Sequence, residues 1–241
     1  MTRTNIVRAR QRTGKEIMFR KREWYFVVVI AILACVFLFL SSELLEANAG
    51  QKEWVGRIDQ DVLSFFAKSR TPGLSGIAVS VTSLGSWPVL TILVLGLSLF
   101  LISFRRFVPA VQITVAALGS ALLTPIFKSH FQRSRPSLEF HAVNVQGFSY
   151  PSGHSLGAGA VYVMMALICW QHIPHLRGRL SLLIFFLVLV LAVGLSRMYL
   201  GVHFFSDVSA GILLGVAWSL IVTVAASSFK SKAKENTNSV A

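Results

Sequence analysis

Residues 180–196 read LSLLIFFLVLVLAVGLS, a stretch without a single charged side chain. A helix of roughly 20 such residues, at ~1.5 Å rise per residue, is long enough to cross the ~30 Å hydrocarbon core of a bilayer. A helix also satisfies its own backbone groups where no water is available. Other segments share this character, so the sequence predicts six transmembrane helices: 25–44, 84–104, 108–127, 154–171, 180–196 and 206–228.

The composition of the whole chain supports the same fold class. Of its 241 residues, 54% are hydrophobic and only 14% are charged, whereas soluble domains carry about 25% charged residues. We therefore predict an all-α polytopic membrane protein with one six-span domain, residues 25–228, between a basic segment, 1–24, and a polar tail, 229–241. Cys35 and Cys169 fall inside apolar segments, which is typical of small buried residues rather than of a disulfide or a metal site.

The basic residues are unevenly distributed between the two sides of the predicted bilayer. Fifteen of the 23 Lys and Arg residues lie before Trp24, at Arg105 and Arg106, around Arg177, or after Phe229, and all these positions share one side. The positive-inside rule makes this side the cytoplasm and places both termini there. Membrane orientation thus explains the formal charge of +13, and we predict no nucleic-acid partner.

The outer segment between the first two spans has two features, each with an alternative. Ala47 and Ala49 resemble a signal-peptide cleavage site, but the preceding apolar stretch is too long for a signal core and favours an uncleaved anchor. Residues 56–69 predict an amphipathic helix lying on the outer surface, with an ordinary ordered loop as the alternative. The apolar stripe of this helix would consist of Val55, Ile58, Val62, Phe65 and Phe66.

Three short motifs at the ends of spans carry the residues with catalytic potential. The first runs from Lys128 to Arg135 after the third span, the second is 151–154 before the fourth, and the third is 196–207 between the fifth and the sixth. Counting spans places all three on the outer face, although each could separately have fallen on either face. Ionisable residues at membrane depth are costly and usually functional. We therefore predict one active site, facing outward.

The residue types in these motifs suit the binding of a phosphate. Lys128, Arg135 and Arg197 supply cations that stabilise anionic oxygens in a phosphoryl-transfer transition state. Guanidinium groups can each bind two such oxygens. Ser152 and Gly153 stand at the predicted start of a helix, where free N–H groups and the helix dipole attract anions. Each motif alone has a structural explanation, as an interfacial anchor or a helix start, and the combination is more specific.

Two histidines and one carboxylate complete the predicted site. His203 and Asp207 are four residues apart, so in a helix they share a face and the carboxylate can accept from one imidazole nitrogen. This pairing fixes the tautomer and leaves the other nitrogen free as a nucleophile. A separate group must then protonate the leaving oxygen, and His154 is the candidate general acid.

The order and internal spacing of the motifs resemble those of the type 2 phosphatidic acid phosphatase superfamily, which includes bacterial membrane lipid phosphatases. The shared pattern is Lys128, then Arg135-Pro136; Pro151-Ser152-Gly153-His154; and Ser196-Arg197, His203, Asp207, with no motif position altered. The resemblance implies a six-helix membrane bundle in a bacterial cytoplasmic membrane and a double displacement without metal or other cofactor. It also implies that His203 forms a phosphohistidine, Asp207 orients it, and His154 acts as acid and then base. The residues that would hold the phosphate are Lys128, Arg135, Ser152, Gly153 and Arg197.

The remaining polar residues receive no catalytic role at this stage. His130 and Arg133, at non-motif positions, are interpreted as facing lipid headgroups, and His141 as solvated in the outer loop. His172 and His175 fall on the cytoplasmic side. No His, Cys, Asp or Glu cluster has the spacing of metal ligands.

We predict a phosphorylated lipid as the substrate, with membrane lipids as the surroundings. Undecaprenyl pyrophosphate, phosphatidylglycerophosphate, phosphatidic acid and a lipid A phosphate are all compatible with the motifs. A lipid-to-lipid phosphotransferase could use the same site, because only the acceptor differs. A transporter is less favoured, because the ionisable residues gather at one membrane edge instead of forming a chain across it. The sequence leaves the oligomeric state, the role of loop 137–150 and the route of lipid entry open.

Overall fold

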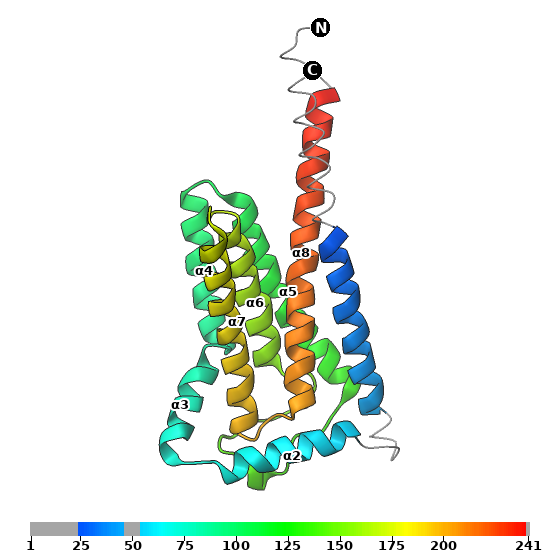
Figure 1. The fold of residues 1–241 in the computed structure, drawn as a ribbon, viewed down its shortest axis with the longest axis vertical. Coiled ribbons are helices and arrows are strands. Elements are labelled where there is room, and N and C mark those ends of the chain that lie inside the picture. Colours follow the sequence, from blue (N-terminus) through cyan, green and yellow to red (C-terminus); the bar gives the residue numbers. More distant parts are fainter. Residues whose placement is uncertain (1–23, 46–53, 240–241) are drawn as a thin grey trace.

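The computed structural model of the chain describes residues 24–45 and 54–239, and all regular elements in these ranges are helical (Figure 1). The first helix is Trp24–Leu45. It is followed by α2 (Trp54–Lys68), α3 (Pro72–Ser83), α4 (Trp87–Ser103), α5 (Phe107–Phe131), a 3₁₀ turn η1 (Leu138–Phe140), α6 (Gly153–Trp170), α7 (Leu176–Tyr199) and α8 (Phe205–Ser239). The predicted basic segment and the signal-like residues 47–49 lie outside the described residues.

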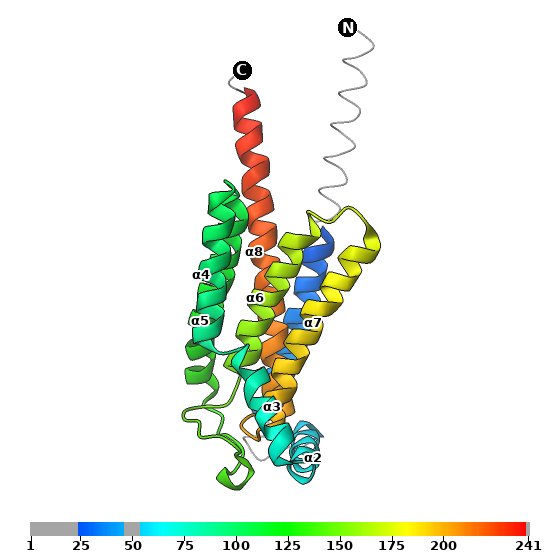
Figure 2. The ribbon, with the colours of Figure 1, turned by 90° about the vertical axis from the view of Figure 1, so that its left-hand side faces the viewer.

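The six-span prediction is confirmed, with one correction to the second span. Five helices are long and apolar enough to cross a membrane, and α3 with α4, bent by 44° at their break, pass the same test as a pair, which gives a sixth candidate span. The sequence prediction started this span at residue 84 and missed α3. The start of α3 nevertheless has local signals: Thr71 accepts a bond from the backbone N–H of Leu74, and Pro72 occupies the first turn. Figure 2 shows α3 leaning away from the line of α4.

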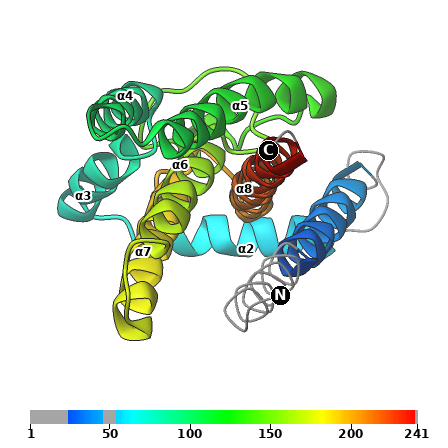
Figure 3. The same cartoon turned by 90° about the horizontal axis from the view of Figure 1, so that it is seen from above.

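The centre of the bundle is α6, which packs against α8, α7 and α5 (Figure 3). Small residues allow α6 and α8 to approach closely, as in many membrane helix pairs. A Cβ added at Gly211 would lie 2.6 Å from the carbonyl oxygen of Ser152, and one at Gly215 would clash with that of Leu156. The small side chains therefore bring the start of α6 and the start of α8 together.

One end of the bundle is crossed by α2, and we call this the α2 end (Figure 1). The 132–152 loop and the α7–α8 connection lie at the same end, whereas α8 extends beyond the bundle at the other end (Figures 1 and 2). The first helix packs here as well, because Ser41 Oγ and Tyr150 Oη form a 2.8 Å hydrogen bond. Tyr150 is fully buried, so it fixes the chain immediately before the second motif.

The predicted surface helix 56–69 is present as α2, but its buried face differs from the prediction. The buried residues are Val55, Asp59 and Leu63, at four-residue spacing. Ile58 and Phe65, which were assigned to the apolar stripe, are 39% and 65% exposed. The protein-facing side of α2 therefore carries a buried carboxylate between Val55 and Leu63, while Ile58 and Phe65 face outward.

Two smaller expectations are also corrected. The helix α8 continues to Ser239, so most of the predicted polar tail 229–241 is helical. Cys35 is exposed on the surface of its helix and Cys169 is only half-buried, because the outer faces of spanning helices pack against lipid rather than protein.

Candidate active site

The structure brings the three motifs together at the α2 end of the bundle. His203 lies in the connection between α7 and α8, and its Nε2 is 3.2 Å from Nη1 of Arg135 in the loop after α5. His154, in the first turn of α6, is close enough to Lys128, Arg135, Arg197 and His203 to interact electrostatically with all four. The structure therefore agrees with the prediction, made by counting spans, that the three motifs form one site.

His203 is held by Asp207 as the four-residue spacing predicted. Its Nδ1 is 3.3 Å from Oδ2 of Asp207, and the same oxygen accepts a 3.0 Å bond from the backbone N–H of Phe204. Both side chains are buried, and burial lowers the pKa of His203 to about 3. The imidazole is therefore neutral near pH 7, with Nδ1–H donating to the carboxylate and the Nε2 lone pair turned toward Arg135.

Two of the cations, Arg135 and Lys128, are positioned by backbone carbonyl groups. Arg135 donates to the carbonyl oxygens of Val202 at 2.8 Å, Gly147 at 2.9 Å and Gln146 at 3.1 Å. Lys128 Nζ donates to the carbonyl oxygen of Phe148 at 2.6 Å. The long loop 132–152 therefore acts as a frame that aims Arg135 and Lys128. Carbonyl groups carry no net charge, so the positive charge of both side chains remains available to an anion.

Arg197 reaches the site from the end of α7 and contacts the bent span. Its Nη1 donates to Thr82 Oγ1 of α3 at 3.1 Å, and its side chain is only 4% exposed. The buried Nε has no hydrogen-bond partner among the residues that the structure describes. Within the same residues, Lys128, Arg135 and Arg197 make no salt bridge with a carboxylate. A buried guanidinium with a free N–H suits an incoming phosphate oxygen.

Ser152 and Gly153 stand at the N-terminus of α6, as expected. Ser152 is the N-cap and is fully buried, and its Oγ accepts from the N–H of Ser155 at 3.4 Å and from Ser155 Oγ at 3.0 Å. The backbone N–H of Ser152 donates to the carbonyl oxygen of Asp207 at 3.0 Å. A Cβ at Gly153 would lie 3.0 Å from Thr124 Cγ2 of α5, so glycine fits the close approach of the two helices there.

Arg133 was predicted to face lipid headgroups, and this prediction is wrong. Its side chain is 11% exposed and donates from Nη1 to Asp207 Oδ1 and Ser206 Oγ, both at 2.6 Å, and from Nη2 to Asp59 Oδ2 at 2.7 Å. The guanidinium lies 4.3 Å from the centroid of the Phe204 ring. Gln132 ends α5 in the left-handed conformation (φ 45°), which turns the next residue toward the start of α8.

Sequence reasoning missed both Arg133 and Asp59 as site residues. A usable signal was present, because Asp59 lies between Val55 and Leu63 on one helical face of α2. A carboxylate in the middle of a buried stripe needs a cationic partner. The sequence did not identify that partner, since Arg133 is 74 residues away.

The other histidines mostly lie as expected. His130 is exposed, and so are His172 and His175. The latter two belong to the α6–α7 connection, which lies at the end of the bundle away from α2 (Figure 2). His141 is the exception, because both of its ring nitrogens are buried. Burial lowers the pKa of His141, so it is packed rather than solvated.

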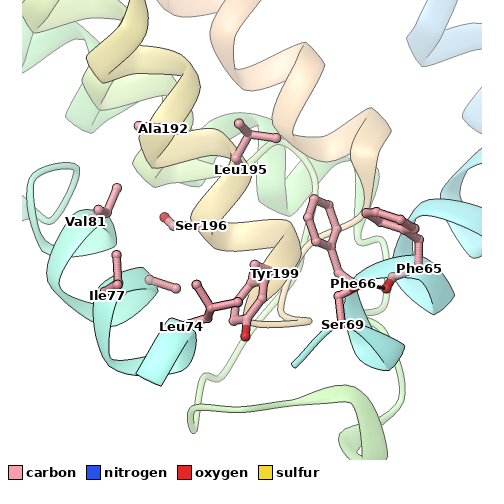
Figure 4. Close-up of a pocket in the computed structure, with 11 residues that line it drawn as sticks. Phe65, Phe66, Ser69, Leu74, Ile77, Val81, Ala192, Leu195, Ser196 and Tyr199 are labelled. Atoms are coloured by element: carbon pink, nitrogen blue, oxygen red, sulfur yellow. Dashed lines mark hydrogen bonds between the residues drawn. The ribbon is translucent and has the colours of Figure 1, made fainter. Parts of the chain in front are cut away.

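An apolar cleft of about 390 Å³ opens at the side of α7 near Ser196 (Figure 4). It lies between the C-terminal end of α2, the helix α3 and the last turns of α7. Ser196 lines the cleft and precedes Arg197, whose guanidinium contacts Thr82 of α3. The lining residues are Phe65, Phe66, Ser69, Leu74, Ile77, Ala78, Val81, Ala192, Leu195, Ser196 and Tyr199.

Comparison with known proteins identifies relatives with this architecture. The family model of the PAP2 superfamily matches residues 109–230. Phosphatidylglycerophosphatase B of Bacillus subtilis (strain 168) is 30% identical over 188 residues, which cover 78% of this chain and 91% of the relative. A lipid A 1-phosphatase of Rhizobium johnstonii is 30% identical over 115 residues, covering 44% of this chain and 43% of the relative. The crystal structure of a transmembrane PAP2 type phosphatidylglycerolphosphate phosphatase from Bacillus subtilis superimposes with a TM-score of 0.73 at 28% identity, covering 84% of this chain and 96% of that one.

Proposed function

Because this chain belongs to the PAP2 superfamily and is therefore a metal-independent membrane lipid phosphatase, we propose that it transfers the phosphoryl group of a lipid to His203 and then to water. The observation that carries this proposal is the environment of His203. Its Nδ1 faces Asp207, while its Nε2 faces Arg135 in a space shared with His154. A buried neutral imidazole with one nitrogen held and the other directed at cations is arranged as a nucleophile for an anionic phosphate.

The substrate phosphate is held by Lys128, Arg135 and Arg197. Arg135 Nη1 lies 3.2 Å from the attacking nitrogen, so an oxygen bound to this guanidinium places phosphorus within reach of His203. The N-terminus of α6 adds the hydroxyl of Ser152, the backbone N–H of Gly153 and the positive end of the helix dipole. These groups stabilise the equatorial oxygens, which carry most of the charge in the transition state.

In the first step, Nε2 of His203 forms a bond to phosphorus as the bond to the lipid oxygen breaks. Asp207 accepts the Nδ1–H hydrogen bond and stabilises the positive charge that develops on the ring. His154 gives its proton to the departing oxygen. General acid catalysis of this kind contributes about 10²–10⁴-fold to the rate.

In the second step, His154 accepts a proton from water, and the water oxygen attacks phosphorus. The bond between phosphorus and Nε2 breaks, inorganic phosphate leaves, and His203 returns to its neutral form. The same residue thus serves as acid and then as base, as microscopic reversibility requires.

The apolar cleft supports a lipid substrate. Ser196, the residue before Arg197, lines the cleft (Figure 4), and Arg197 contacts α3, which forms another wall of it. A hydrocarbon chain in the cleft and a phosphate at the guanidinium could therefore belong to one molecule. Phosphatidylglycerophosphate, the lipid in the name of the Bacillus subtilis relative, is the first candidate. A lipid A phosphate follows from the Rhizobium relative, and undecaprenyl pyrophosphate and phosphatidic acid remain in the panel to be tested.

We place the site on the outer face of a bacterial cytoplasmic membrane, with both termini in the cytoplasm. The chain is a multi-pass membrane protein, and the orientation rests on the distribution of Lys and Arg. Substrates of the inner leaflet would then have to cross the bilayer before hydrolysis.

The test is phosphate release by the purified protein in detergent, across the four candidate lipids. His203→Ala should abolish release from every lipid while the protein still elutes as a folded species, and His130→Ala, an exposed histidine, should retain release. Phosphate from a ³²P-labelled lipid should remain on the wild-type protein in alkali and be absent from His203→Ala. Normal release from His203→Ala would refute the mechanism, and label appearing on a second lipid would show the phosphotransferase instead.

A further inference from the structure

A continuous line of polar contacts connects the surface helix α2 to the nucleophile. Asp59 of α2 accepts from Arg133 Nη2 at 2.7 Å, and Arg133 Nη1 donates to Asp207 at 2.6 Å. Asp207 in turn faces Nδ1 of His203. Three separate parts of the chain contribute to this line, namely α2, the residues after α5, and the start of α8.

The two oxygens of Asp207 have different partners. Oδ1 accepts from Arg133, while Oδ2 faces His203 and accepts from the backbone N–H of Phe204. With one oxygen anchored on a planar guanidinium, the carboxylate is held against rotation. The direction of Oδ2, and through it the orientation of the His203 ring, therefore depends on Arg133.

Arg133 is itself held in place by Asp59. The carboxylate of Asp59 is 1% exposed, and it accepts from the backbone N–H of Ser206 at 2.8 Å and from Ser206 Oγ at 2.6 Å. These bonds place a negative charge at the N-terminus of α8, where the helix dipole favours it. Asp59 thus fixes both Arg133 and the helix start that carries Asp207.

We propose that Asp59 and Arg133 are positioning residues for the phosphoryl transfer, which hold Asp207 ionised and directed at His203 and make α2 a required part of the active site. This proposal rests on the function proposed above. Neither residue touches the phosphate, so their loss should reduce kcat and leave KM nearly unchanged.

The charge around Asp207 determines how each variant responds to pH. The charged and titratable groups near this carboxylate, from all the elements packed around it, are His203, Arg133, Lys128, Arg135, Tyr150 and, through Arg133, Asp59. The acidic limb of the pH profile reports protonation of the coupled His203–Asp207 pair. Removing the positive charge of Arg133 raises the proton affinity of this pair, whereas removing the negative charge of Asp59 does not.

The experiment measures kcat and KM as functions of pH, with the lipid of the panel that the wild-type protein hydrolyses fastest. Arg133→Gln should lower kcat by at least ~100-fold, with KM within about threefold, since the nucleophile loses its orientation. Its acidic limb should move to higher pH by about one unit. Arg133→Lys keeps the positive charge, but its single ammonium group can bind only one of the two carboxylates. The value of kcat should therefore fall by about tenfold, with the acidic limb at the same pH as in the wild-type protein.

Asp59→Asn has a matched control in Asp61→Asn, because Asp61 lies on the same helix and is exposed. Asp59→Asn should lower kcat by about tenfold with no upward shift of the acidic limb, and Asp61→Asn should behave like wild type. The concentration of active protein is taken from the folded fraction after size exclusion. If Arg133→Gln does not fold, Arg133→Lys and Asp59→Asn test the proposal in its place.

A purely structural role predicts that rates fall in proportion to folded protein, with the pH profile unchanged. That outcome, or identical behaviour of Asp59→Asn and Asp61→Asn, would overturn the proposal. In either case, an inactive His203→Ala would leave the proposed function intact, whereas an active His203→Ala would overturn the function itself.

Discussion

Gly211 lies on α8 one turn after Asp207, and its replacement by alanine should separate the two halves of the active site. A Cβ at this position would lie 2.6 Å from the carbonyl oxygen of Ser152, 3.0 Å from Ser155 Cβ and 3.2 Å from the backbone nitrogen of Leu156. The nearest of these atoms belongs to the backbone at the start of α6. It cannot turn aside as a flexible side chain could, so the helices themselves must move apart.

The required movement follows from the contact distance. Ordinary contacts of a Cβ begin at 3.4 Å, so α8 and α6 must separate by about 0.8 Å at this level. The bond from the Ser152 N–H to the Asp207 carbonyl oxygen, now 3.0 Å, would then be broken. His203 and Asp207 move with α8 while Ser152 and His154 stay with α6. A misplacement on the order of 1 Å costs about 10²-fold in rate, and overpacking costs about 1–3 kcal/mol of stability.

The assay is phosphate release from the best lipid substrate in detergent, together with thermal unfolding of the same preparations. Gly96→Ala is the matched control, because this glycine of α4 also lies within a span and has nothing within 4 Å of its added Cβ. Gly96→Ala should keep wild-type kcat and gain up to about 1 kcal/mol of stability. A Gly211→Ala protein with wild-type kcat per folded molecule would refute the close-approach argument.

Three further predictions concern the cleft, the phosphate and pH. Ala192→Phe fills part of the apolar cleft and should raise KM for long-chain lipids by about tenfold. Hydrolysis of a soluble phosphomonoester should be unchanged. Equal effects on both substrates would disprove a role of the cleft in binding the hydrocarbon chain. Arg197→Lys should weaken inhibition by orthovanadate by at least ~10-fold, measured as the inhibition constant, because a single ammonium cannot replace a fork-shaped donor. Burial lowers the pKa of His203 to about 3, below the usual value of 6.5. Between these two pH values the imidazole is protonated in the unfolded state and neutral in the folded state. Stability should therefore fall as pH decreases from 6.5 toward about 3, and His203→Asn should flatten this slope in thermal unfolding scans.

The spanning helices could be predicted from the sequence because bilayer thickness sets their length. Four of them, α5 to α8, begin within a few residues of the predicted positions. The helix α3 was missed because its sequence, PGLSGIAVSVTS, mixes glycine and hydroxyl residues with apolar ones and fails a test based on long apolar stretches. Its only local evidence is the cap at Thr71 and the proline that follows.

The candidate site likewise contains residues that the sequence predicted and residues that it missed. Motif residues such as His203 and Asp207 are recognisable because their relationship is local, four residues along one helix start. The pairing of Arg133 with Asp59 depends on the left-handed turn at Gln132 and on where α2 crosses the bundle. These are properties of the tertiary structure, so the sequence predicted the reacting groups but missed what holds them.

The contribution of α8 also has a consequence for the biosynthesis of the protein. Helices emerge from the ribosome in chain order, and α8 is the last one. Until Asp207 arrives, the guanidinium of Arg133 has only Asp59 as a carboxylate partner within the described residues, and His203 lacks the carboxylate that holds its ring. A nascent chain can therefore acquire full phosphatase activity only once α8 has been inserted. A chain that ends before α8 should be inactive, because it lacks Asp207.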